Sequence, residues 1–408
     1  MPPASFPSPL SSDRARVLVL GQAAHNTGFA RVLSSILDRL KEDLDIVHFG
    51  LNHRGEAQER GWRLLPNNLL GDPLGREQLG SLLEQYRPHL LFICHDYWLF
   101  GIHAATIEEY EREHRERLRS VLYCPVEFPF AYPSELSPLR AVTQIVAYTR
   151  YGHDELLAAF QKEGGTGPEQ PIKIVPHGLD ITQFRPLLGP DRLRESRLAA
   201  RRILFPDRPE LENVFIILNA NRNVQRKRVD LTLEAFAIFA QEHPDAYLYL
   251  HMGMKDAGLD IMRYLERPSV AAVKDRLLLT TTELEKPEVT DECLNLIYNA
   301  CDVGLNTATG EGWGMVGFEH AATGAAQIVP DVGACTELWA EAGILVPTID
   351  TLISPTEVAL ALARLYSDRE WLNLASARAF ARARSPELDW DRIARQWHRI
   401  WLEVLERD

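Results

Sequence analysis

The chain has 408 residues, of which 46% are hydrophobic and 25% are charged, and its formal net charge is −13. This length predicts two domains with a core each, and the acidic balance makes a nucleic-acid partner unexpected. Five cysteines without a CxxC pair, and no apolar run of transmembrane length, indicate a cytoplasmic protein. Peripheral contact with the inner face of a membrane stays open.

Short apolar runs alternate with segments of helical periodicity along the whole chain. In the first half, strand-like runs lie at 16–21, 45–50, 90–95, 121–126, 144–149 and 172–176, and a helical segment lies at 28–40. In the second half, they lie at 213–219, 246–251, 276–280, 301–306, 325–330 and 343–347, with a helical segment at 230–241. This alternation predicts parallel sheets with helices on both faces.

The charged, proline-punctuated stretch 186–212 is typical of a linker with one exposed helix. We therefore predict an α/β protein with two Rossmann-like, doubly wound domains, at 1–186 and 187–385. Residues 386–408 are expected to form a last helix, with Ser385 as its N-cap. Sheets of this kind bind ligands at the carboxyl ends of their strands, so we expect the site in a central cleft that the two domains face.

The stretch "NTATGEGWGMVGFEHAATGAAQIVP" at 306–330 combines two glutamates with several glycines at a strand-to-helix junction. Glycines let a ligand approach the backbone, and free amides at a helix start favour an anion. Glu319 should lie about one turn inside the helix and Glu311 on the preceding loop. Because carboxylates bind hydroxyl groups strongly, the pattern predicts a nucleotide-sugar site. The alternative is a glycine turn with two solvated glutamates.

This stretch resembles the E-x7-E signature of retaining, GT-B-type glycosyltransferases, the family that includes glycogen synthases and phosphatidylinositol mannosyltransferases. Residues 174–186 and 221–236 resemble two further segments of the same family. Arg222 and Lys227 keep the family's spacing, whereas Asn221 and Arg228 replace two glycines and His177 replaces the usual asparagine. The resemblance covers most of 170–345 and extends weakly over the rest.

The resemblance implies a hexosyltransferase that uses a nucleoside diphosphate sugar, retains the anomeric configuration and needs no cofactor. Glu319 would bind the ribose hydroxyls, Glu311 the transferred sugar, and Arg222 and Lys227 the diphosphate. The other implied donor contacts are Gly28, Gly312, Gly314, Met315 and Val316 at the sugar or phosphates, and Thr282 and Leu284 near the base. The family also implies that the C-terminal helix crosses back to the N-terminal domain.

The acceptor is not identified by the sequence, and a glycan, lipid, protein or small molecule stays open. His95, Asp96 and Glu127 follow strand-like runs of the first domain, so they are the candidate acceptor residues, against a purely structural role.

No metal is expected, because the Asp-x-Asp triplets at 43–45 and 389–391 do not follow strands and the histidines lack metal-ligand spacing. Two alternatives to a transferase remain: a nucleotide-sugar 2-epimerase on the same fold, and a non-catalytic nucleotide-sugar-binding protein.

Overall fold

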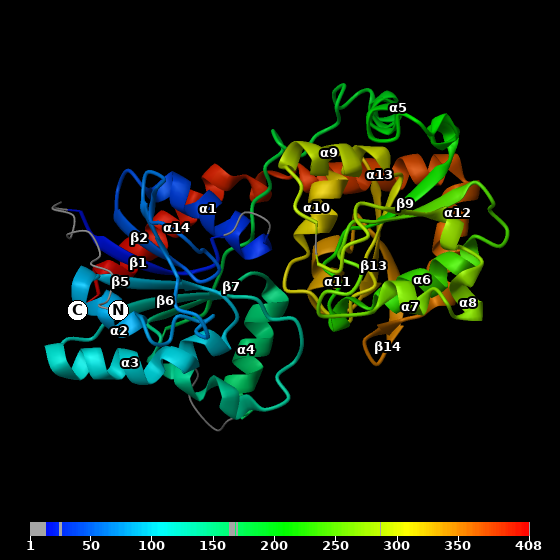
Figure 1. Ribbon diagram of the computed structural model, residues 1–408. Coiled ribbons are helices and arrows are strands. Elements are labelled where there is room, and N and C mark those ends of the chain that lie inside the picture. The colour runs from blue at the N-terminus through cyan, green and yellow to red at the C-terminus, as the bar shows by residue number, and fades with distance from the viewer. Residues whose placement is uncertain (1–13, 24–26, 163–167, 169, 286, 408) are drawn as a thin grey trace. The chain divides into compact units, whose positions relative to one another are not determined.

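The computed structural model describes residues 14–23, 27–162, 168, 170–285 and 287–407 (Figure 1). The chain divides into two compact units. The first combines the residues up to Gly178 with those from Trp390 onward, and the second spans Leu179–Asp389. Each unit is built around its own sheet.

The sheet of the first unit has the strand order β3-β4-β2-β1-β5-β6-β7-β8. All neighbours are parallel except β3 and β4. The order reverses at β1 and β5, which pair although β2, β3 and β4 separate them in sequence. The strands are β1 Arg16–Gly21, β2 Asp45–Gly50, β3 Gln58–Glu59, β4 Arg63–Pro66, β5 Leu90–Cys94, β6 Arg119–Cys124, β7 Gln144–Ala147 and β8 Lys173–Ile174.

Helices cover both faces of this sheet (Figure 1). Helix α14 packs against α1 and against β5 and β6. Its Trp397 and Trp401 rings both contact Phe92 of β5, with centroids 5.2 and 4.9 Å away. The helices are α1 Gly28–Leu40, α2 Leu79–Tyr86, α3 Trp98–His114, α4 Arg150–Lys162 and α14 Trp390–Leu405, with a 3-10 segment η1 at Pro133–Ala141.

The sheet of the second unit has the order β11-β10-β9-β12-β13-β14-β15, and only β14 and β15 pair antiparallel. Here the order reverses at β9 and β12. The strands are β9 Phe215–Asn219, β10 Ala246–Leu250, β11 Leu277–Leu279, β12 Val303–Leu305, β13 Ala326–Asp331, β14 Ile344–Ile349 and β15 Leu352–Ile353.

The helices of the second unit follow its strands, with α6 packed on α12 and α9 packed on α5. They are α5 Leu193–Leu204, α6 Val229–Phe239, α7 Ile261–Tyr264, α8 Pro268–Ala271, α9 Asp291–Ala300, α10 Met315–Ala321, α11 Gly333–Trp339, α12 Pro355–Ser367 and α13 Arg369–Ala383. The 3-10 segments are η2 Pro209–Asn213, η3 Gln225–Lys227, η4 Lys274–Arg276 and η5 Pro386–Leu388.

The predicted fold class is confirmed, because both sheets are mostly parallel and doubly wound. Every predicted strand is present within a few residues, and α1 has the predicted bounds. The strands β3, β4 and β15 were not predicted; they are short and lie at or next to sheet edges.

Three boundary features differ from the sequence-based expectation. The first unit ends at Gly178, before the expected boundary at residue 186, because the backbone N–H groups of Arg185 and Leu187 donate to Asn295 and Asn299 of α9. Helix α5 is not simply exposed, since its Arg201 is 3% exposed. Ser385 is not the cap of the last helix: it precedes the 3-10 segment η5, and α14 begins at Trp390.

Candidate active site

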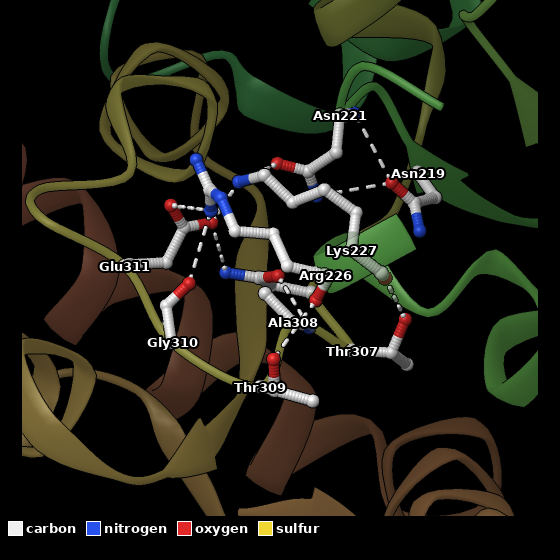
Figure 2. Close-up of polar contacts among 10 residues, drawn as sticks. Asn219, Asn221, Arg226, Lys227, Thr307, Ala308, Thr309, Gly310 and Glu311 are labelled. Atoms are coloured by element: carbon white, nitrogen blue, oxygen red, sulfur yellow. Dashed lines mark hydrogen bonds and ion pairs between the residues drawn. The ribbon is translucent and has the colours of Figure 1, made fainter. Parts of the chain in front are cut away.

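The loops after β9 and β12 meet where the strand order of the second unit reverses. β9 and β12 are parallel neighbours, so both loops leave the same edge of the sheet. Reversal points at the carboxyl edge are where open α/β sheets bind ligands. The two loops, together with helix α10, carry most of the residues that the sequence assigned to the donor. Lys227 and Glu311 of that set are shown in Figure 2.

Glu311 lies at the centre of this group and is buried, with 3% of the residue exposed. One oxygen, Oε1, accepts from Lys227 Nζ in a short contact and from Asn306 Nδ2 at 3.1 Å. The other, Oε2, accepts from Arg226 at 3.2 Å. Lys227 also donates to Asn221 Oδ1 at 3.0 Å. A carboxylate in this setting is fixed in position by two cations and an amide (Figure 2).

The charge state of the group follows from these contacts. Burial raises the pKa of Glu311, but Lys227 and Arg226 outweigh burial and hold that pKa below its ordinary value. Glu311 is therefore ionised at neutral pH. Two cations against one carboxylate leave a positive balance in the group, which favours an anionic ligand nearby.

Backbone contacts join the two loops as well. The Thr307 hydroxyl donates to the carbonyl oxygens of Lys227 and Arg228, at 3.0 and 2.9 Å. The backbone N–H of Thr309 donates to the Arg226 carbonyl at 2.9 Å, and the Arg226 side chain donates to the Gly310 carbonyl at 3.0 Å. These bonds set the position of both basic side chains relative to the glycine loop.

Gly314 ends the loop and precedes α10 with φ of 83°, a left-handed conformation that favours glycine. The first amides of the helix, from Met315 and Val316, have no acceptor within its first turn. Glu319 lies inside α10 and is buried; Tyr298 of α9 donates to its Oε2 at 2.8 Å. The sequence placed both glutamates correctly, one on the loop and one on the helix, with Gly312 buried between them.

Arg222 lies on the loop after β9 and pairs with an acidic side chain of the loop after β10. Its guanidinium forms a two-point ion pair with Asp256, at 2.7 and 3.0 Å, and its side chain is 61% exposed. Leu284 belongs to the loop after β11, together with Thr282, and its carbonyl accepts from the backbone N–H groups of Lys255 and Asp256. The loops after β9, β10 and β11 are thus linked in series.

The acceptor candidates lie at the carboxyl edge of the first unit's sheet. His95 and Asp96 directly follow β5, and His95 is buried while Asp96 and Glu127, which follows β6, are half-buried. Burial lowers the pKa of His95, and Asp96 acts against that shift. Gly28 is exposed and begins α1, where the Thr27 side chain accepts from Ala30 N–H. Residues 24–26, which precede Thr27 and Gly28 in the chain, lie outside the described residues.

Metal-binding geometry occurs elsewhere in the molecule. Among residues 14–23, 27–162, 168, 170–285 and 287–407, one group of carboxylate and imidazole ligand atoms lies close enough to share an ion, namely Glu84, Glu113 and His114. These residues lie on or beside α2 and α3, and Glu84 and His114 are already bonded to each other and to Arg87. The group contains none of the donor candidates.

Sequence reasoning missed four participants: Arg226, Asn306, Asn221 as a partner of Lys227, and Tyr298. Arg226 stands directly before Lys227, so a basic pair was visible, but its partner Glu311 is 85 positions away. Tyr298 follows no motif of its own. Only the packing of α9 on α10 brings it to Glu319.

Most of the second unit resembles a known protein family. Residues 213–368, which contain both loops, match the family model of glycosyl transferases group 1. The second unit carries a glycosyl transferases group 1 domain. The resemblance to glycosyltransferases is thereby confirmed, whereas the match says nothing about retention of configuration.

Solved structures share the fold over nearly the whole chain. One is Anabaena Alr3699/HepE in complex with UDP and glucose, with TM-score 0.69 and 16% identity over 96% of this chain and 100% of that one. Another is the E. coli trehalose-6-phosphate structure bound with UDP-2-fluoro glucose, with TM-score 0.70 and 15% identity over 97% and 100%. At these identities the likeness shows the fold.

A curated relative is the mannosylfructose-phosphate synthase of Agrobacterium fabrum, 25% identical over 199 residues. The match covers 48% of this chain and 39% of the relative, so the chain aligns with well under half of that protein's length.

None of the helices in the described part of the chain combines the length and the apolarity needed to span a membrane.

Proposed function

We propose that this protein transfers a hexosyl group from a nucleoside diphosphate sugar to an acceptor. The observation that carries the proposal is the Lys227–Glu311–Arg226 group at the strand reversal of the second unit, inside a domain of the glycosyl transferases group 1 family. UDP is the first nucleotide to test, because structurally similar proteins are named as complexes with UDP or UDP-glucose.

The proposed roles follow the chemistry of each group. Glu319 binds the ribose hydroxyls, and Glu311 binds hydroxyls of the transferred sugar while it holds Lys227 in place. The amides of Gly314, Met315 and Val316 face the sugar or phosphates. Gly28 of the first unit, and backbone groups near Thr282 and Leu284, are the remaining proposed donor contacts.

The leaving group needs positive charge, because cleavage of the sugar–phosphate bond adds negative charge to the diphosphate. Lys227 and Arg226 supply a surplus over Glu311, and preorganised charges of this kind stabilise a transition state without reorganising. Arg222 is proposed as a third cation that Asp256 orients. On this account the reaction proceeds without a metal and with retention of configuration.

The deciding experiment combines binding and turnover. UDP-, GDP-, ADP- and TDP-sugars are screened by thermal shift, where a ligand at 100 times its Kd adds about 2.7 kcal/mol of stability. The stabilising donor is then incubated with and without candidate acceptors, in Mg²⁺ and in EDTA. Acceptor-dependent release of nucleoside diphosphate in both buffers supports the proposal, and loss of binding in EDTA contradicts its metal independence. Isomerisation of the donor without an acceptor would identify an epimerase instead, and binding without turnover a binding protein.

A further inference from the structure

Aromatic side chains gather at the strand reversal of the first unit. β1 and β5 pair there, so the turn that follows β5 and the start of α1, which follows β1, lie at one edge of the sheet. Phe29 of α1 stacks on His95 with ring centroids 5.1 Å apart and planes 5° apart. The Trp98 ring contacts the His95 ring edge-on, with the ring centroids 5.4 Å apart. We call Phe29, His95, Tyr97, Trp98 and Phe130 the aromatic rim.

The rim continues onto the loop after β6, the strand next to β5. Tyr97 meets Phe130 of that loop edge-on at 5.0 Å, and its hydroxyl donates to Glu135 at 2.7 Å. Trp98 is 40% exposed although it is a tryptophan at the start of a helix. Its contact with His95 fixes the ring, so the exposed part is a preorganised apolar surface.

The polar groups of the rim are those that bind hydroxyls. His95 is 6% exposed, and its Nδ1 makes no hydrogen bond within the described part of the chain; the nearest carboxylate oxygen, on Asp96, is 3.6 Å away, beyond hydrogen-bond distance. Two charged side chains in contact with the rim, Asp96 and Glu135, are acidic. Carboxylates accept strong hydrogen bonds from hydroxyls but repel a phosphate.

We propose that the aromatic rim is the acceptor subsite and that it takes an uncharged saccharide, whose apolar pyranose face packs on Trp98 and whose hydroxyls reach the nearby carboxylates. This inference rests on the proposed function. A pyranose has an apolar face of C–H groups and a hydroxylated edge, which matches one exposed ring beside polar groups. A protein partner would need about 800 Å² of surface, far more than one partly exposed tryptophan offers. Sugar phosphates, which relatives' names suggest as ligands, fit the acidic surroundings poorly.

Saturation-transfer NMR on the full chain tests the inference, with saturating UDP or whichever nucleoside diphosphate binds. The neutral probes are maltose, cellobiose and methyl α-glucopyranoside, and the charged probes are glucose 6-phosphate and fructose 6-phosphate. We expect at least one neutral probe to bind more tightly than both phosphates. The substitution Trp98→Ala should weaken that binding about tenfold or more, and Trp98→Phe should retain much of it. The control is Trp371→Ala, at a half-buried tryptophan of the second unit, which should leave the binding unchanged.

Tighter binding of the sugar phosphates, or no binding of any neutral probe, overturns the inference. So does neutral binding that Trp98→Ala leaves intact. A separate titration with the nucleoside diphosphates alone tests the donor site of the second unit. If none of UDP, GDP, ADP and TDP binds, the proposed function itself fails. If a nucleotide binds but no neutral saccharide does, only the acceptor inference is overturned.

Discussion

Lys227 and Glu311 are 84 positions apart in the chain and form a buried ion pair that joins the loops after β9 and β12. The side chains are 9% and 4% exposed, so neither charge is well solvated. A buried pair adds little net stability, but losing one partner leaves the other charge uncompensated. The pair is therefore a structural element as well as a proposed part of the donor site.

Removal of the Glu311 charge should destabilise the second unit. Glu311→Gln keeps the side chain's shape but leaves Lys227 and Arg226 facing each other, so we expect the free energy of unfolding to fall by about 3–5 kcal/mol. Urea unfolding followed by circular dichroism measures this loss. Glu341→Gln, on an exposed glutamate of the same unit, is the control and should change little. Equal stability of the Glu311→Gln variant and the wild type would contradict the structural role.

Lys227 should act on the leaving group more than on the bound donor. Lys227→Met keeps much of the apolar stem and removes the charge, so turnover should fall by roughly 10²–10³-fold, the scale for one lost transition-state donor. Arg226→Met should also lower turnover, since Arg226 shares the Glu311 carboxylate. Nucleoside diphosphate release at saturating donor is the measurement, with the exposed Lys274→Met as control. Near-normal turnover in both site variants would contradict the proposal that Lys227 and Arg226 stabilise the leaving group.

Glu319 and Tyr298 should affect nucleotide affinity as a pair. Glu319→Gln removes the charge proposed to bind the ribose, and we expect affinity for the nucleoside diphosphate to fall by about 1.5–3 kcal/mol. Tyr298→Phe removes only the hydrogen bond that positions Glu319, worth about 0.5–1.5 kcal/mol. Calorimetric titration compares them. A larger loss in Tyr298→Phe than in Glu319→Gln would show that Glu319 does not contact the nucleotide.

Three buried histidines should make the protein sensitive to mild acid. Burial lowers the pKa values of His48, His177 and His320 to about 3 in the folded state, whereas an unfolded histidine titrates near 6.5. Between these values the unfolded state binds more protons, so stability falls as the pH drops below about 6.5. Melting temperatures from pH 7.5 to 5 measure the slope.

The variant His177→Asn should flatten that slope, because it removes one group that must take up a proton on unfolding. His153→Asn is the matched control, since His153 is only half-buried. An identical slope in the His177→Asn variant and the wild type would mean that His177 is not shielded from water.

The C-terminal helix should be essential for the first unit. Trp397 is fully buried, and its ring meets Phe92 and Tyr123, at 5.2 and 4.7 Å. Trp397→Ala should cost about 3–5 kcal/mol of unfolding free energy because it leaves a cavity. Trp371→Ala, at a half-buried position, should cost less. Differential scanning calorimetry measures both, and equal losses would contradict the proposed packing.

The sequence by itself determined all strands except β3, β4 and β15, the helices α1 and α6, and the positions of Glu311 and Glu319. Buried parallel strands are continuous apolar runs, and the apolar residues of a helix recur every three or four positions. Both patterns can therefore be recognised in the local sequence. Glycine spacing likewise placed one glutamate on a loop and the other on a helix. The edge strand β15 was not visible, because two residues carry no periodicity.

Only the tertiary structure decided which side chains meet. The partners Arg226 and Glu311, Arg222 and Asp256, and Tyr298 and Glu319 come from different elements, and their pairing depends on the order of strands in the sheet. The same holds for Phe29 and His95, which face each other because β1 and β5 are neighbours. The local sequence does not determine the strand order, because that order results from the packing of the whole unit.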